Sequence, residues 1–290
     1  MHESVLLNEV IKGLELEDGD VVLDMTLGAG GHSKAILETG KNIELIGIDQ
    51  DISAIAIAEE KLSPWKDKVK IISGNFKDAE KLLAEIGVTK VSKILFDLGV
   101  SSMQLDNPER GFSFRHDAPL SMKMSDKMLF SARDIVNDWK EEDIANVIFA
   151  YGEERKARTI AKAIVRARNL RPIETTFELV AIVEKAVGKK PWSKINPATK
   201  TFQALRIAVN DELGALKSGL VAAEKIIAPK GKIAVISFHS LEDRIVKNFM
   251  KDLPKDSWKI LTKKPIEASD EEKTINHRSR SAKLRLIEKI

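Results

Sequence analysis

The sequence contains no cysteine, and only five of its 290 residues are histidines. The absence of cysteine excludes disulfide frameworks, cysteine-ligated zinc, iron–sulfur clusters and a cysteine nucleophile. Five histidines leave little for a histidine-rich site, so we expect no bound metal.

Long apolar runs are also missing. No segment approaches the roughly 18 apolar residues of a membrane-spanning helix. The first ten residues, MHESVLLNEV, lack the basic and apolar regions of a signal peptide. The composition, 43% hydrophobic and 31% charged, is that of a globular protein. We therefore expect a cytoplasmic protein without a membrane partner, and nothing in the sequence indicates an oligomeric state.

The small net charge of +3 hides an uneven distribution. Residues 230–290 carry 15 Lys and Arg against 9 Asp and Glu, a net of +6, whereas residues 1–229 carry 32 against 35, a net of −3. A second basic segment, residues 151–172, has seven basic and two acidic residues. These segments are either ordinary solvated surface or contacts for a polyanion such as a nucleic acid.

Apolar runs alternate with helical segments along the first hundred residues. We expect strands at 21–26, 43–49, 69–75 and 91–99, with short helices between them. Three more strands are expected at 231–238, 258–266 and 282–290, the last two antiparallel. The pattern predicts an α/β fold, a doubly wound, mostly parallel, seven-stranded sheet with an antiparallel last strand.

This alternation is interrupted by helical sequence. Helices are expected at 135–139, 141–151, 154–168 and from about Thr175 to Val187, followed by a loop at 189–197. A long helical region from Pro197 to Ile227 is expected to bend near Gly214 or Gly219. We therefore predict an inserted all-helical domain at 108–197, within a ligand-binding domain formed by 1–107 and 198–290.

Polar residues fall at or near the ends of four predicted strands. Asp24 lies near the end of the first predicted strand, which is followed by the glycine turn GAGG, residues 28–31. Asp49, Asn75 and Asp97 lie at or near the ends of the next three strands. Ligands of open α/β sheets bind outside the carboxyl ends of strands, so these coincidences predict one site.

The form of the glycine turn distinguishes between ligands. The pyrophosphate of NAD favours a third glycine, but this chain has Ser33 there and an acid, Asp24, four residues before the first glycine. An added carboxylate suits a cationic ligand such as S-adenosylmethionine better than NAD. Asp49 lies 19 residues after Gly30, where an acid accepts hydrogen bonds from ribose hydroxyls.

Several further residues are candidates for substrate contact. A helical projection from Glu154 places basic residues on one face and apolar residues on the opposite face. The basic candidates are Arg155, Arg158, Lys162 and Arg166, together with Arg278 and Arg280 near the C-terminus. His239 follows the fifth predicted strand, as a base, as a substrate contact or, as is commoner for a lone histidine, in a structural role.

At this point the residues resemble a known family, the bacterial 16S ribosomal RNA cytosine-N4 methyltransferases (methyltransferase H). Matching segments run in order along nearly the whole chain: GAGGHS (28–33), DLGVSSMQLD (97–106), RGFSFR (110–115), YGEER (151–155), PATKTFQALRIAVNDEL (197–213), VISFHSLEDRIVK (235–247) and NHRSRSAKLR (276–285). Two positions depart from the family pattern: Ser4 replaces a usual proline, and SMKMS at 121–125 replaces a run that usually contains two aspartates.

The resemblance implies a class I methyltransferase domain with a helical insertion. It implies contacts to the cofactor S-adenosylmethionine at Gly30, Gly31, His32, Asp49, Phe76, Asp97 and Gln104. It also implies a target cytosine in the decoding region of small-subunit ribosomal RNA, so that the partner is this RNA or the small ribosomal subunit.

The absence of cysteine then favours methylation of the exocyclic amine, because methylation of cytosine carbon-5 ordinarily needs a cysteine thiolate. We expect Asp97 or a nearby backbone carbonyl to accept a hydrogen bond from the amine. Phe112, Phe114 or Phe238 is expected to stack on an unpaired or flipped base.

Three alternatives remain at this stage: a nucleotide-dependent oxidoreductase, a noncatalytic RNA-binding factor and a DNA amino-methyltransferase. The last typically carries an acid or Asn, two prolines and an aromatic residue after the fourth strand, where this chain has DLGV.

Overall fold

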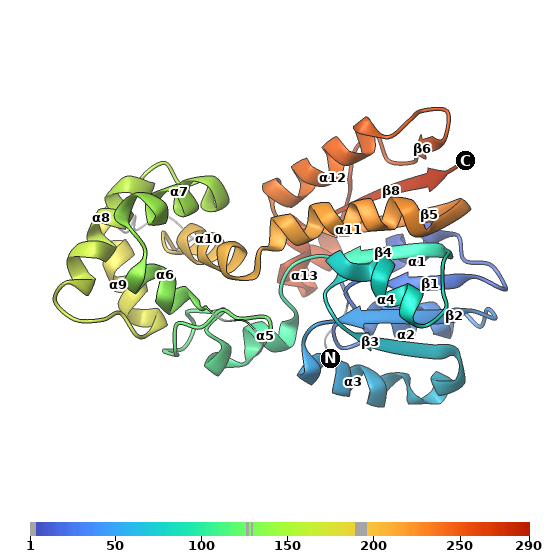
Figure 1. Ribbon diagram of the computed structural model, residues 1–290, viewed down its shortest axis with the longest axis horizontal. Coiled ribbons are helices and arrows are strands. Elements are labelled where there is room, and N and C mark those ends of the chain that lie inside the picture. The colour runs from blue at the N-terminus through green and yellow to red at the C-terminus, as the bar shows by residue number, and fades with distance from the viewer. Residues whose placement is uncertain (1–3, 126–127, 129, 189–195) are drawn as a thin grey trace. The chain divides into compact units, whose positions relative to one another are not determined.

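Eight strands form one mixed sheet in the order β3-β2-β1-β4-β5-β8-β6, with β7 paired to β8 (Figure 1). Their bounds are β1 (Val21–Asp24), β2 (Glu44–Asp49), β3 (Val69–Ser73), β4 (Val91–Asp97), β5 (Ile227–Ser237), β6 (Trp258–Ile260), β7 (Ile266–Glu267) and β8 (Lys283–Lys289). Strands β1 to β5 pair in parallel, whereas β8 is antiparallel to β5, β6 and β7. This computed structural model, which describes residues 4–125, 128, 130–188 and 196–290, confirms the predicted α/β sheet.

The predicted strand at 258–266 is divided into β6 and β7, which raises the number of strands from seven to eight. Between them, the hydroxyl of Thr262 accepts a hydrogen bond from the backbone N–H of Leu286 at 2.9 Å. Pro265 precedes β7 and has no N–H to donate. A side chain and a proline therefore interrupt a ladder that the apolar pattern alone predicted to be continuous.

Two packed layers cover the sheet. Alternate strand residues, such as Val22 and Leu95, pack in one cluster with α1 (Leu7–Leu14), α2 (Gly31–Glu38) and α3 (Ile52–Leu62). Their neighbours Leu23 and Ile94 pack in the other cluster with α4 (Ala79–Glu85), α11 (Glu212–Ile226) and α12 (Ser240–Asp252). Successive side chains of a strand point to opposite faces, so a continuous apolar run buries both.

The chain divides into two units, which we call the sheet unit (Met1–Gly99 with Leu213–Ile290) and the helical unit (Val100–Glu212). The sheet unit also contains α13 (Asp270–Ile275) and the 3-10 helices η1 (Ser63–Lys68), η2 (Phe76–Asp78) and η4 (His277–Ser281). The helical unit contains α5 (Ser102–Asp106), η3 (Pro108–Arg110), α6 (Ala132–Asp138), α7 (Glu141–Gly152), α8 (Ala157–Arg168), α9 (Thr176–Val187) and α10 (Thr199–Asn210). No helix in the described ranges is both long and apolar enough to cross a membrane.

The helical unit has its own core, formed by apolar residues of α6 to α10 such as Ile144, Ile160, Leu179 and Leu205. Thr175 rather than Thr176 caps α9, because the Thr175 hydroxyl accepts a hydrogen bond from Glu178 N at 3.4 Å. Of the predicted loop 189–197, residues 189–195 lie outside the described residues.

The long helical region predicted from Pro197 to Ile227 is two helices, and the break falls at Asp211 rather than at Gly214 or Gly219. Asp211 has φ of +47°, a left-handed conformation that aspartate tolerates better than most residues. The carboxylate of Glu212 accepts hydrogen bonds from Arg206 Nε and Nη2 at 2.8 and 2.9 Å, which fastens the chain after the break.

Candidate cofactor-binding site

The acids predicted at strand ends do lie at one edge of the sheet. Asp24, Asp49 and Asp97 are the last residues of β1, β2 and β4, and these strands are parallel. Asn75 follows β3, and its Nδ2 donates a hydrogen bond to Gln50 Oε1 at 3.0 Å. Carboxyl ends of parallel strands meet at the same edge, so the fold gathers these groups there.

The glycine turn lies between β1 and α2 and is fastened to the end of β2. Gly28 N donates a hydrogen bond to Asp49 Oδ2 at 2.7 Å. Gly28 and Gly30 have φ of +52° and +72°, which glycine adopts at little cost. Gly31 begins α2, and a Cβ there would collide with Ser4 Oγ. The side chains of Leu62 and Ser4 therefore occupy the space beside Gly30 and Gly31, and the chain itself requires glycine at both positions.

Asp24 is buried, and both of its carboxylate oxygens accept hydrogen bonds. Oδ2 accepts from Ser33 Oγ at 2.7 Å and Oδ1 accepts from Thr26 N at 3.1 Å. Burial raises the pKa of Asp24 from 3.8 to about 6, although these hydrogen bonds and the nearby His32 oppose the rise. The chain's own side chains therefore compensate the charge of Asp24 only in part.

Asp49 accepts a second hydrogen bond, from Asp51 N to Oδ1 at 2.8 Å. Burial raises the pKa of Asp49, and its backbone hydrogen bonds partly oppose this. Each carboxylate oxygen has two acceptor sites, so Asp49 keeps the capacity to accept hydroxyl groups as well.

Asp97 is held by its backbone and by one carboxylate oxygen. Asp97 N donates a hydrogen bond to Thr26 Oγ1 at 2.6 Å. Oδ2 lies 3.4 Å from Nδ1 of His32, whereas Oδ1 is buried with no hydrogen-bond partner in the part of the chain that the structure describes. A buried acceptor without a partner is costly in a folded protein, and a bound donor would remove that cost.

Phe76 begins η2 and packs edge-on against Phe96 with ring centroids 5.7 Å apart. It lies against Gly219 of α11, where an added Cβ would approach the ring to 2.6 Å. The ring is half-buried. It therefore contributes to the core, while a cofactor contact at Phe76 stays a prediction.

S-adenosylmethionine carries a sulfonium and an ammonium group and has a ribose. The orphaned Oδ1 of Asp97 suits a cationic or amine donor, and Asp49 suits ribose hydroxyls. The residues of this edge therefore fit the cofactor that the sequence predicts.

His239 and Phe238 follow β5. His239 caps α12: its Nδ1 accepts from Glu242 N at 3.4 Å, and its Nε2 lies 3.3 Å from Glu242 Oε1. Glu242 is buried and also accepts from the backbone N–H of Phe238 at 2.8 Å. These contacts of His239 with Glu242 support its structural role, and substrate contact at Phe238 or His239 stays a prediction.

Other candidates lie in the helical unit. Gln104 caps α5 together with Ser101, and its Oε1 accepts from Ser101 N at 3.1 Å. Phe112 is only 7% exposed and belongs to the core of this unit. Phe114 packs edge-on against Phe202 with centroids 4.9 Å apart. Their roles toward cofactor or base stay predictions.

The basic face of α8 forms as the helical projection indicates. Arg158, Lys162 and Arg166 are exposed, whereas Ile160 and Ile164 are fully buried. Arg155 is exposed as well, but it precedes the helix, because α8 begins at Ala157 rather than at Glu154.

The second basic cluster lies in the sheet unit. Arg278 is half-buried in η4. Arg280 is exposed there, and its Nε donates to Lys273 O at 3.1 Å.

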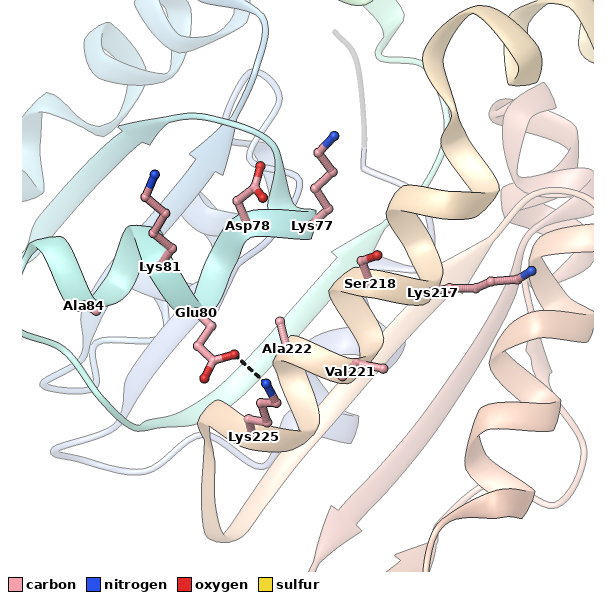
Figure 2. A pocket seen from close by; sticks show the side chains of 10 residues that line it. All are labelled: Lys77, Asp78, Glu80, Lys81, Ala84, Lys217, Ser218, Val221, Ala222 and Lys225. Carbon is pink, nitrogen blue, oxygen red and sulfur yellow. Dashed lines mark hydrogen bonds and ion pairs between the residues drawn. The ribbon is translucent and has the colours of Figure 1, made fainter.

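A separate pocket lies between α4 and α11 (Figure 2). Lys225 and Glu80 form an ion pair of 2.9 Å across it, while Figure 2 shows Lys217 pointing away from α4. None of the predicted site residues lines this pocket.

The contacts of three polar residues near the strand ends were not predicted from the sequence. Ser33 donates a hydrogen bond to Asp24, and Thr26 accepts one from the backbone of Asp97. Only the position of Ser33 and Thr26 beside the glycine turn indicated these contacts. Glu242 was detectable, because a cap residue followed by Glu three positions later is typical of a helix start.

Comparison with known proteins identifies the family of the chain. The model of the MraW methylase family matches residues 1–290. A protein of Deinococcus deserti named ribosomal RNA small subunit methyltransferase H is 50% identical over 100% of this chain and 94% of its own length. A protein of Wolbachia sp. subsp. Drosophila simulans with the same name is 48% identical over 100% of this chain and 99% of its own length.

The fold has a counterpart among solved structures. A crystal structure of a Clostridium thermocellum protein assigned as an rRNA methylase aligns over 100% of both chains, with a TM-score of 0.51 and 15% identity. At that identity the likeness shows the fold alone. Together with the full-length family match, it sets aside the oxidoreductase and the noncatalytic binder: the chain belongs to the MraW methylase family and is an S-adenosylmethionine-dependent methyltransferase.

Proposed function

We propose that this enzyme transfers the methyl group of S-adenosylmethionine to the exocyclic N4 amine of a cytosine in the decoding region of small-subunit ribosomal RNA. The observation that carries the RNA substrate is the full-length identity of 50% and 48% to two proteins named ribosomal RNA small subunit methyltransferase H. Ribosomal RNA is assembled in the cytoplasm of bacteria, where we expect the enzyme to act.

One feature of the chain supports the amine as the acceptor. The chain has no cysteine to add to the cytosine ring, as carbon-5 methylation ordinarily requires. The amine nitrogen instead attacks the methyl carbon directly, the carbon–sulfur bond breaks, and S-adenosylhomocysteine leaves. The nitrogen then loses one proton, which restores the neutral amine.

Asp97 is the residue that we place beside the reacting amine. Its buried Oδ1 accepts a hydrogen bond from the amine and so aligns the nitrogen with the methyl group. Alignment of two reactants supplies a large part of such a rate enhancement. Asp49 accepts hydrogen bonds from the ribose, and the backbone of Gly30 and Gly31 receives the remainder of the cofactor.

The RNA is held by basic side chains. Arg158, Lys162 and Arg166 are exposed on one face of α8, and Arg155 is exposed just before this helix, which suits the phosphate backbone. Such basic residues suit RNA and DNA alike, and it is the names of the relatives that favour RNA over the DNA substrate of the remaining alternative.

Transfer of a tritiated methyl group tests the proposal. The enzyme is incubated with labelled S-adenosylmethionine and either naked small-subunit RNA or small subunits that lack the modification, and the label is mapped. We expect N4-methylcytosine at one site in the decoding region. Label on another base, or on DNA in preference to RNA, refutes the assignment.

The Asp97→Ala variant tests the role of Asp97. If Asp97 aligns the amine, turnover falls at saturating cofactor by about 10²-fold or more, which is typical for loss of an aligning group. Turnover and cofactor affinity equal to those of the wild type would eliminate this role.

A further inference from the structure

His32 lies in the first turn of α2 and is 5% exposed. Both of its ring nitrogens face an acceptor. Nε2 lies 3.0 Å from the carbonyl oxygen of Val5, and Nδ1 lies 3.4 Å from Oδ2 of Asp97. A carbonyl oxygen only accepts hydrogen bonds, so Nε2 carries a hydrogen.

The second contact then fixes the charge of the ring. A neutral imidazole with its hydrogen on Nε2 would turn the lone pair of Nδ1 toward the carboxylate of Asp97, which is repulsive. An imidazolium donates to both partners instead. Asp97 on β4 and Asp24 on β1 are the charged groups that act on the ring, and both are acidic.

The balance of burial and charge supports the imidazolium. Burial by itself lowers the pKa of His32, but the hydrogen bond to Asp97 and the charges of Asp97 and Asp24 outweigh it, so that the pKa is raised.

The carbonyl of Val5 is held in place by its neighbours. Leu6 N donates to Glu272 Oε1 at 2.9 Å, and Ser4 Oγ lies against Gly31. Leu6 has φ of +53°, so the chain turns sharply after Val5. His32 therefore connects a fixed N-terminal segment, residues 4–6, to the carboxylate at the end of β4.

We propose that His32 is a positioning residue: its imidazolium binds Oδ2 of Asp97 and thereby directs Oδ1 toward the reactants. This inference deepens the proposed function and rests on it for the role of Asp97. The contact between His32 and Asp97 is independent of the proposed function. The side chain of His32 is engaged by Val5 and Asp97, so any cofactor contact at this position comes from its backbone.

The positive charge of His32 has a chemical consequence. The imidazolium engages Oδ2 of Asp97, so Asp97 orients the amine through Oδ1. The proton leaves the methylated nitrogen to solvent after the carbon–sulfur bond has broken.

Nitrogen-15 NMR of the full chain, labelled at histidine and free of cofactor and RNA, tests the charge directly. The His32→Gln variant identifies the resonances of His32. At about pH 7 we expect both ring nitrogens of His32 to carry hydrogen. In Asp97→Asn we expect the midpoint of His32 titration to fall by about one pH unit or more, because the anion is gone. An unprotonated Nδ1 in the wild type at about pH 7 overturns the inference.

Two substitutions separate positioning from general stability. The amide of His32→Asn can donate to Asp97 but does not reach Val5, whereas His32→Gln reaches Val5 but not Asp97. At saturating cofactor we expect His32→Asn to turn over at least tenfold faster than His32→Gln, with similar urea unfolding midpoints. Equal turnover of the two variants overturns positioning through Asp97. The NMR result needs no methylation, so a protonated His32 in an enzyme that leaves ribosomal RNA unlabelled refutes the proposed function alone.

Discussion

The burial of Asp24 can be tested directly, because the effect of its carboxyl group on the free energy of unfolding depends on pH. Its pKa is raised from 3.8 to about 6 by burial. One pKa unit corresponds to about 1.4 kcal/mol, so the ionised carboxylate lowers the free energy of unfolding by about 3 kcal/mol relative to an unshifted one. The pKa is higher in the folded state. The stability contributed by the neutral form is therefore fully present below about pH 4 and is lost as the pH rises through about 6.

The Asp24→Asn variant removes this dependence. An asparagine in the same place can accept from Thr26 N and donate to Ser33 Oγ, so both hydrogen bonds keep a partner. From the two pKa values, about half of the loss of unfolding free energy caused by ionised Asp24 is present at pH 5, and all of it is present above pH 7. The free energy of unfolding of the variant relative to the wild type should therefore rise by about 1.5 kcal/mol between pH 5 and pH 8.

Urea unfolding followed by circular dichroism at the two pH values measures this difference. Asp67→Asn is the matched control, since it removes one negative charge at an exposed position. A difference that is independent of pH, or that falls as the pH rises, would refute the assignment of a buried and poorly compensated charge to Asp24. We also expect the variant to bind S-adenosylmethionine more weakly, by about tenfold, because a nearby negative charge favours its cationic groups.

The remaining predictions concern packing and the RNA contact. Gly31→Ala places a methyl group on Ser4 Oγ and should lower stability by about 1–3 kcal/mol in thermal unfolding, and Ser4→Gly in the same chain should restore most of the loss. Asn210→Ala should cost about 2–4 kcal/mol, because Asn210 donates to Met122 O and accepts from Met124 N inside the helical unit; an unchanged urea midpoint would contradict this. Replacing Arg158, Lys162 and Arg166 by Gln should reduce the slope of log affinity against log salt for RNA by about two to three. The control is the same replacement of three exposed lysines, Lys41, Lys66 and Lys70. An equal reduction of the slope in both triple variants would argue against a specific basic face.

The sheet and the site edge were predictable because their signals are periodic. Strands such as β4 are continuous apolar runs that end in a polar residue, and the end of each parallel strand falls at the same edge. The positions of Asp24, Asn75 and Asp97 relative to the sheet follow from that rule alone. The basic face of α8 was predictable for the same reason, since its period of 3.6 residues separates Arg158 from Ile160.

Features set by single side-chain contacts were not predictable. The break at Asp211 depends on a backbone conformation with positive φ and on the Glu212–Arg206 ion pair, whereas the sequence drew attention to glycines. The division of β6 from β7 depends on a hydroxyl of Thr262 that replaces a ladder bond. Likewise, the resemblance names His32 as a cofactor contact, but no pattern in the sequence indicates that its ring lies between Val5 and Asp97.

In each of the three acids of the site, the carboxylate is incompletely compensated by the chain. Asp24 and Asp49 have raised pKa values, and Asp97 has a buried oxygen without a partner in the described chain. The ring of His32 lies beside one of these carboxylates, that of Asp97, and the pKa of His32 is raised. A cationic cofactor adds positive charge at this edge of the sheet, so its binding should lower the pKa of Asp24 and raise the stability of the sheet unit together. If the proposed placement of the cofactor is right, the positively charged methyl donor should therefore lower the pKa of Asp24 more than its neutral-sulfur product does.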